Sequence, residues 1–312
     1  MASFQNVQVT NEMIPTEIKK PIMLGTSEND FNVRLEEGGT MELDGGEWII
    51  GSPAFGSNTS TFVALDSIIL KNGARIITNG NLLTIIVNKF KSENGKILSF
   101  PQNAKADNGD NGVNLGESGS AGAPGDHGGK VTVICIQEFL GVLTIDLSGQ
   151  NGGNGGNGVV GAEGARGDRG PDARDGYLYC ERGGGKGAQG ATGMPGGNGG
   201  DGGVGGAGGF LEVLTIGDQP LDQVQYSFIS SGGAGGIGGN PGAGGAGGNG
   251  GPGGHGSKFC GGGKTGDQGP IGTTGAVGSQ GLRGADGANL VKNLKLAAVI
   301  QLGVAKSGSF IS

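Results

Sequence analysis

The sequence predicts an all-β and irregular protein. We expect an N-terminal β domain, either a meander or a short solenoid, followed by a single-chain polyglycine-II helix bundle of about six rods on a small β base. Three observations predict it: glycine recurs at every third position through four long runs, asparagine–glycine pairs separate the apolar runs of residues 35–100, and apolar connectors join the glycine runs. We therefore divide the chain into an arm at 1–34, a β domain at 35–100 and a rod bundle at 101–312.

Composition restricts both the core and the partners. With 76 glycines in 312 residues and 5% aromatic residues, the chain holds too little apolar material for an ordinary core of its length. A net charge of -7 argues against binding to nucleic acid or to an anionic membrane. The first twenty residues lack the apolar segment of a signal peptide, and no run is apolar enough for membrane insertion. We expect synthesis in the cytoplasm without a signal peptide, and a final place on a virion or outside the cell after lysis.

The first hundred residues have an ordinary composition. Residues 1–34 are polar and contain Pro15 and Pro21, so we interpret them as an arm that docks on another molecule. Asparagine–glycine pairs begin at positions 72, 79 and 94, between apolar runs, and this dipeptide is a strong signal for a turn between strands. An antiparallel meander and a short β-solenoid both fit this pattern.

The glycine runs have a period of three, which is the period of polyproline II geometry. Collagen shares this period, but the runs here are interrupted and the chain has only 11 prolines. A polyglycine-II bundle fits better, because backbone N–H groups then reach carbonyls on neighbouring rods without a side-chain core. The structural glycine frame is bounded by Gly149 and Gly170, Gly184 and Gly208, Gly233 and Gly254, and Gly263 and Gly287.

The number of glycines in each triplet predicts which rods are enclosed. A rod packed on two faces needs two glycines per triplet, whereas an outer rod needs one. We expect 196–209 and 232–254 to be central and 158–170 and 263–287 to face solvent.

The connectors between the glycine runs are of two kinds. The apolar segments 130–148 and 210–230 alternate like strands, so we expect short β-hairpins that form the base. The polar segments 171–183 and 255–262 are expected to be tip loops. A shorter hairpin is expected from about 101 to 128, with its turn near 113–115.

The tip loops hold the candidate binding residues. Aromatic and arginine side chains on a rigid scaffold are typical of recognition surfaces. The candidates are Arg174, Tyr177, Tyr179, Arg182, His255, Lys258 and Phe259. An alternative remains open, in which Tyr177 and Tyr179 only close the end of the bundle. Cys180 and Cys260 lie one in each tip loop; two unpaired thiols are favoured there over a disulfide or a metal site, and their pairing is left open.

Tandem GGxGG rods folded back within one chain resemble the polyglycine-II domains of bacteriophage long-tail-fibre adhesins. The resemblance covers about residues 101–290 and implies a terminal domain that docks on a fibre and rod-end loops that contact a host receptor. The rods are also similar in kind to the glycine-rich domain of Obg GTPases, which has six such rods on a β base. Because no GxxxxGK[ST] phosphate loop occurs in this chain, that family's activity is not implied.

Catalytic motifs are missing from the sequence. The two histidines, His127 and His255, lie far apart, and acidic residues are scattered through the triplets. The tripeptide Arg166-Gly167-Asp168 is interpreted as ordinary triplet filling. We therefore expect neither an enzyme nor a cofactor nor a metal.

The sequence favours a non-enzymatic receptor-binding adhesin, such as a phage tail-fibre tip. Its expected partners are a cell-surface receptor, either a glycan or an outer-membrane protein, and a fibre or particle protein; no nucleic-acid partner is expected and the oligomeric state is left open. The main alternative is a structural scaffold or spacer that binds a partner through its N-terminal β domain. A hydrated-surface binder ranks last, because the outer triplets carry charged residues such as Glu163 and Arg169.

Overall fold

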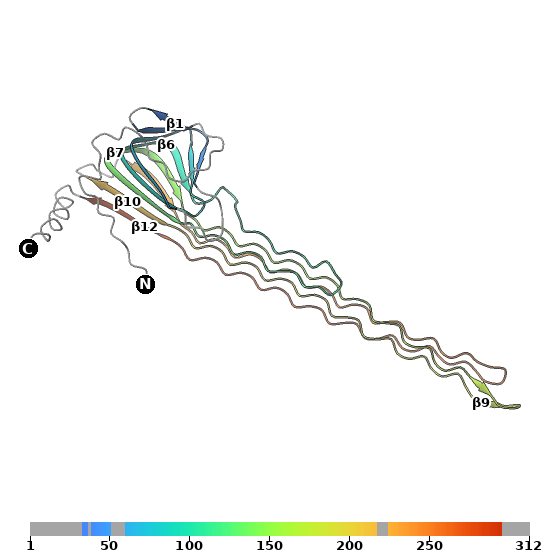
Figure 1. Ribbon diagram of the computed structural model, residues 1–312. Coiled ribbons are helices and arrows are strands. Elements are labelled where there is room, and N and C mark those ends of the chain that lie inside the picture. The colour runs from blue at the N-terminus through green and yellow to red at the C-terminus, as the bar shows by residue number, and fades with distance from the viewer. Residues whose placement is uncertain (1–32, 37–38, 51–59, 217–223, 295–312) are drawn as a thin grey trace, which may run out of the picture.

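The computed structural model describes residues 33–36, 39–50, 60–216 and 224–294. A β-sheet lies at one end, and a long thin shaft of glycine-rich segments projects from it to a small hairpin at the far end (Figure 1). Most of the apolar, strand-forming sequence lies in the sheet, and glycine-rich sequence fills the shaft.

Within the described residues, ten strands form the sheet, in the order β1-β2-β4-β6-β7-β10-β12, with β5 pairing β3 and β6, and β11 pairing β7. The strands are β1 (Val33–Glu36), β2 (Thr40–Asp44), β3 (Glu47–Ile49), β4 (Ser60–Lys71), β5 (Arg75–Ile77), β6 (Leu82–Leu98), β7 (Lys130–Asp146), β10 (Phe210–Ile216), β11 (Val224–Ile229) and β12 (Ala288–Leu294). Among these pairs only β1 and β2 run antiparallel.

Successive passes of the chain stack as parallel rungs. The two long strands β6 and β7 pair with each other along their length. On its other side β6 pairs with β4 and then with β5, and on its other side β7 pairs with β10 and then with β11. At the corner between β4 and β5, Asn72 and Gly73 both have positive φ, 51° and 70°. Asparagine and glycine tolerate this left-handed backbone, so the pair turns a rung rather than reversing it into a hairpin.

The core lies along one side of the stacked rungs. Alternate residues of β4, β6 and β7 are buried, as expected for strands with one covered face. Trp48 and Phe90 are among the largest fully buried side chains, and the Phe90 and Phe139 rings meet edge to face at 5.0 Å between centroids. This apolar cluster anchors the shaft.

The structure corrects the predicted fold class. The described residues contain no helix, and their regular structure is strand, mostly in one parallel sheet, so the prediction of a polyglycine-II helix bundle on a small β base is wrong. The predicted base hairpins are also wrong, because 130–146 forms a single strand through Gly141 and pairs in parallel with its neighbours. Alternating apolar residues fit parallel and antiparallel pairing equally well, and a glycine period shows where backbones approach without showing their helical state.

Residues 39–98 and the later apolar connectors share this one sheet, which continues without a break past residue 100. The predicted arm lies outside the described residues apart from the start of β1.

Six extended segments, called legs here, form the shaft. They are leg 1 (106–112), leg 2 (116–128), leg 3 (149–170), leg 4 (184–208), leg 5 (232–254) and leg 6 (263–287). Each pair of legs is a hairpin inserted between two successive parallel rungs of the sheet. Legs 1, 3 and 5 therefore all run away from the sheet, and legs 2, 4 and 6 all return to it. The hairpin of legs 1 and 2 ends part way along the shaft (Figure 1).

The hydrogen bonds of the sheet continue into the legs. Leu147 donates its N–H to the carbonyl of Ile229, and two residues later Gly149 donates to Ser231 in the same direction. From there every third residue of leg 3 donates to leg 5, as leg 4 does to leg 6, over distances of 2.8–3.0 Å. The predicted frame glycines all donate a backbone hydrogen bond to another segment of the chain: Gly149, Gly170, Gly184, Gly208, Gly233, Gly254, Gly263 and Gly287. Parallel stacking of the rungs thus sets the register of the shaft.

The number of glycines in a triplet follows the number of neighbouring legs. In leg 4, Gly200 faces leg 2 so closely that a Cβ would lie 1.9 Å from the Ser120 carbonyl oxygen. Its equivalents Gly197, Gly203 and Gly206 approach leg 2 in the same way. Beyond the end of leg 2 this position holds larger residues: Met194, Ala191 and Ala188. The sequence of leg 4 therefore records where the short hairpin stops.

A carboxylate closes the turn of that short hairpin. Glu117 Oε2 accepts the backbone N–H groups of Val113 and Asn114, at 2.9 and 2.7 Å. The Asn114 and Val113 amides lower the pKa of the Glu117 carboxyl. Leg 1 thereby reverses into leg 2 without leaving the turn amides unsatisfied.

Candidate recognition site at the tip of the shaft

The far end of the shaft consists of two loops. Between legs 3 and 4, strands β8 (Arg174–Asp175) and β9 (Cys180–Arg182) form a small antiparallel hairpin. Its turn is closed by the Gly176 N–H, which donates to the Tyr179 carbonyl at 2.9 Å. The Tyr179 ring lies over Gly176, where a Cβ would be 2.6 Å from the ring, so a larger residue at this position would displace the exposed tyrosine side chain.

The loop between legs 5 and 6 is a tighter turn. Ser257 donates its N–H to the Cys260 carbonyl at 2.9 Å, which places Lys258 and Phe259 at the apex. The Lys258 ammonium lies 5.1 Å from the centre of the Phe259 ring, a favourable cation–π arrangement. Each loop therefore presents large side chains at its turn.

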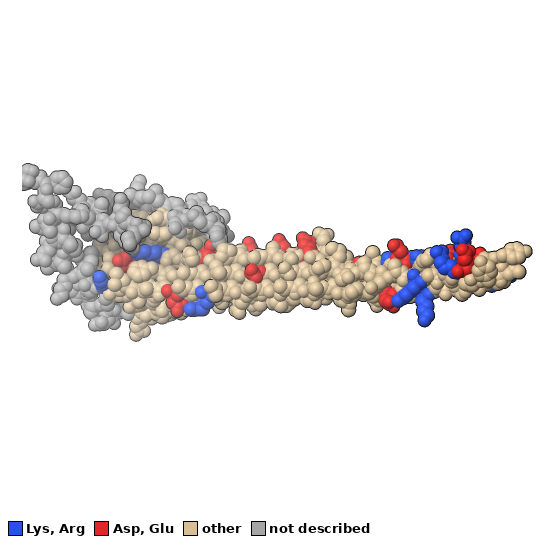
Figure 2. Space-filling view, turned by 90° about the horizontal axis from the view of Figure 1, so that it is seen from below, with Lys and Arg blue, Asp and Glu red and all other residues tan. Residues whose placement is uncertain are grey.

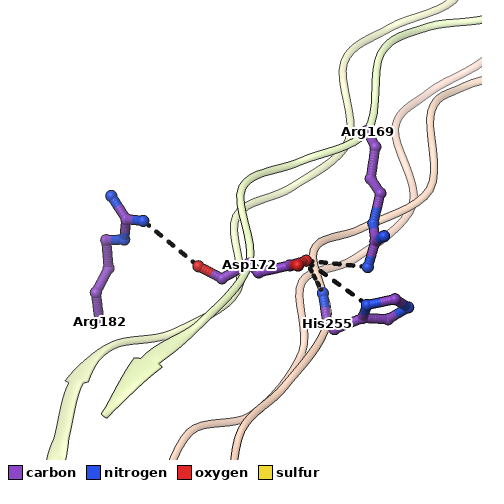
Figure 3. Close-up of polar contacts among 4 residues, drawn as sticks. All are labelled: Arg169, Asp172, Arg182 and His255. Carbon is purple, nitrogen blue, oxygen red and sulfur yellow. Dashed lines mark hydrogen bonds and ion pairs between the residues drawn. The ribbon is translucent and has the colours of Figure 1, made fainter. Parts of the chain in front are cut away.

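Two aspartates hold the loops together. Asp172 Oδ1 accepts the His255 N–H at 2.7 Å and pairs with Arg169 at 2.9 Å, while the Asp172 carbonyl oxygen accepts a long bond from Arg182 at 3.4 Å (Figure 3). Asp175 Oδ1 accepts the Ser257 hydroxyl and the Phe259 N–H. Residues more than 80 positions apart thus form one composite tip.

A disulfide joins the same two loops. Cys180 and Cys260 are bonded, with an S–S distance of 2.02 Å, across 80 residues of sequence. The sequence-based preference for two unpaired thiols is therefore wrong. Spacing along the sequence could not show that the two hairpins reach the same point along the shaft, because the register of the parallel strands determines that alignment.

The candidate residues all lie at this tip, with their side chains turned outward to different extents. Tyr177 is 91% exposed, Tyr179 63% and Phe259 40%, so the aromatic rings do not fill the end of the shaft. Arg174, Arg182, His255 and Lys258 are exposed as well. Sequence reasoning missed Leu178, which is 72% exposed between the two tyrosines, and the bridging aspartates. Asp172 directly follows Pro171 at the end of leg 3, a position that the triplet register marks as loop.

The environment of Asp172 favours its ionised form, which bridges the two tip loops. The His255 N–H, and after it the charges of Arg169 and His255, lower the pKa of the Asp172 carboxyl. The carboxylate is therefore ionised over the ordinary pH range and remains available to bridge the loops.

The remaining thiol lies at the other end of the molecule. Cys135 is buried in the sheet, and burial raises the pKa of its thiol to about 11. A thiol of this kind is largely protonated at neutral pH and is a poor nucleophile. Within the described residues, no group of three or more His, Cys, Asp or Glu side chains is arranged to hold a metal ion.

The described part of the chain has no helix of the length and apolar character needed to cross a bilayer. No protein family model, curated protein sequence or solved structure matches this chain.

Proposed function

We propose that this protein is a non-enzymatic recognition protein, a receptor-binding adhesin that presents the composite tip at the end of a rigid glycine-rich shaft. The observation that carries the proposal is the placement of exposed Tyr177, Leu178, Tyr179 and Phe259 together at the point farthest from the sheet. Exposed aromatic side chains on a fixed frame are typical of recognition surfaces.

Rigidity of the frame supports the same proposal. The tip is held by a disulfide, by two bridging aspartates and by the hydrogen-bond ladder of the legs. A preorganised surface loses little conformational entropy when it binds. A cell-surface receptor is the partner that a projecting, preorganised tip fits, and a fibre or particle protein at the sheet end would place the tip outward.

The test is binding of the labelled full chain to a panel of bacterial cells and to purified surface glycans. A variant with Tyr177, Tyr179, Arg182 and Phe259 changed to Ala is compared with a control in which the exposed shaft residues Ile237, Ile271, Val277 and Leu282 are changed to Ala. The adhesin predicts strain-selective binding that the tip variant loses and the control keeps. Equal binding by both variants, or none by the well-folded native chain, contradicts it.

A scaffold function is the second candidate, and one feature of the sheet favours it. Ala64, Ile86, Ile134 and Leu214 lie side by side across four strands on the face opposite the core, and all are only half-buried. Phe62 extends this apolar row and is 41% exposed. If this face rather than the tip binds the partner, tip substitutions leave binding unchanged and Ile86→Lys abolishes it.

A further inference from the structure

Positive charge on the shaft is concentrated at its distal end. Four of the five Lys and Arg residues on the legs lie near the tip, and legs 1, 2 and 5 carry none. The four are Arg166, Arg169, Lys186 and Lys264, and the tip loops add Arg174, Arg182 and Lys258. On the visible face in Figure 2, blue side chains gather toward the tip with red ones among them, and a long stretch of the shaft before them carries only red or uncharged residues.

Four acidic side chains near the tip are already engaged, whereas Asp168 on leg 3 makes no ion pair among the described residues. Asp172 pairs with Arg169, Glu181 with Arg174 at 3.1 Å, and Asp267 with Lys186. The Asp175 carboxylate accepts hydrogen bonds from Ser257 and Phe259. These carboxylates therefore have little capacity to bind further cations.

Four of these seven cations have no carboxylate partner among the described residues: Arg166 on leg 3, and Arg182, Lys258 and Lys264 closer to the tip. The Arg182 guanidinium donates to the Asp172 backbone carbonyl, Lys258 lies over the Phe259 ring, and Lys264 makes no ion pair. The tip thus offers unpaired positive charge beside exposed aromatic rings, although the whole chain carries a net charge of -7.

We propose that the tip binds an anionic glycan, a saccharide that carries carboxylate or phosphate groups. Guanidinium and ammonium groups make charge-assisted hydrogen bonds to such anions. Tyr177 and Tyr179 supply flat apolar faces for sugar rings and hydroxyls for their polar edges. This inference rests on the proposed function, since it names the receptor class of the same tip.

The rest of the shaft orients the protein toward an anionic surface. Legs 1 and 2 carry four acidic residues and no Lys or Arg: Asp107, Asp110, Glu117 and Asp126. Electrostatic interactions decay over a Debye length of about 8 Å at physiological salt, which is short beside an extended shaft of this kind. An anionic surface therefore repels the acidic hairpin but attracts the tip, and the protein approaches with its tip first.

The experiment measures binding of the full chain to immobilised polygalacturonate, to a phosphate-bearing teichoic acid and to neutral dextran, at low and at high salt. The variant, called the charge variant here, carries Arg182→Gln, Lys258→Gln and Lys264→Gln. Its matched control is Lys89→Gln, Lys96→Gln and Lys292→Gln, which removes the same charge from exposed lysines of the sheet. The carboxylated and phosphorylated polymers distinguish the two sources of negative charge.

We expect the native chain to bind at least one anionic polymer, more weakly at high salt, and not dextran. The charge variant is expected to lose at least tenfold in affinity, and the control is expected to bind within about twofold of the native chain. Failure of the native chain to bind either anionic polymer, equal binding to dextran, or equal losses in both variants overturns the inference. If the aromatic tip variant still loses cell binding in that case, the adhesin function stands and only the anionic receptor class is wrong.

Discussion

Gly200→Ala is the substitution that most directly tests how the shaft is held together. The new Cβ would lie 1.9 Å from the Ser120 carbonyl oxygen, whereas real Cβ contacts are essentially never shorter than 3.0 Å. The Cβ position is fixed by the backbone and the Ser120 oxygen is itself a backbone atom, so leg 2 must move away from leg 4 by more than an ångström. No side-chain rotation can relieve this overlap.

Three hydrogen bonds depend on that contact. Gly119 and Gly122 of leg 2 donate to leg 4 on either side of it, each at 2.9 Å, and Ser120 accepts from Gly156 of leg 3 at 2.9 Å. At about 1 kcal/mol net for each bond, their loss destabilises the native shaft by about 3 kcal/mol. Restricting the unfolded chain with alanine offsets this by about 0.4–1 kcal/mol, which leaves a decrease of about 2–3 kcal/mol in the free energy of unfolding.

The assay is urea unfolding together with hydrogen exchange of the Gly119 and Gly122 amides. Gly261→Ala is the control, because a Cβ there meets nothing within 4 Å and its backbone is not left-handed. We expect the control to stay within about 0.5 kcal/mol of the native chain, as surface substitutions usually do. An equally small effect of Gly200→Ala, with unchanged exchange at Gly122, would refute the account of close leg packing.

Two further predictions concern the tip. In the native chain no cysteine should react with iodoacetamide, as counted by alkylated mass; a mild reductant should expose Cys180 and Cys260, and Cys135 should react only after unfolding. The double substitution Cys180→Ser with Cys260→Ser should lower the free energy of unfolding, measured by urea titration, by up to about 4 kcal/mol. Because the pKa of Asp172 is lowered in the folded protein, its stabilisation of the tip is present above its ordinary value of 3.8 and is lost as the pH falls through the lowered pKa. In the native chain, protection of the His255 amide from hydrogen exchange should therefore decrease at pH values below 3.8, and in Asp172→Asn it should be low at every pH. An unchanged protection factor in Asp172→Asn would contradict the role of Asp172 in bridging the two loops.

Local sequence rules predict parts of this protein whose cause is local. Only glycine fits where a Cβ would meet a carbonyl, so Gly200 and its equivalents mark the contact between legs 2 and 4 directly in the sequence. The asparagine at position 72 likewise marks a corner with positive φ. The Asn72–Gly73 pair did not reveal whether the chain turns back into a hairpin or continues as the next parallel rung, because both kinds of turn use a left-handed residue.

Features that arise from register were not accessible from the sequence. Parallel stacking of β7 on β10 and β11 aligns the second and third hairpins, and this alignment brings Cys180 to Cys260 and Asp172 to His255. Nothing near any of these residues along the chain specifies its partner about 80 positions away. The tip residues could be named as a group, but their union into one surface could not.

Hydroxyl-radical footprinting of the full chain, free and bound to a receptor-bearing strain, tests the central claim that the tip is the recognition surface. Tyr177 and Tyr179 report on the tip, exposed Leu282 on the shaft and Phe62 on the sheet. The account predicts that oxidation of the two tyrosines falls on cell binding while that of Leu282 and Phe62 is unchanged. Protection of Phe62 with no change at Tyr177 and Tyr179 would contradict it and would place the binding surface on the sheet.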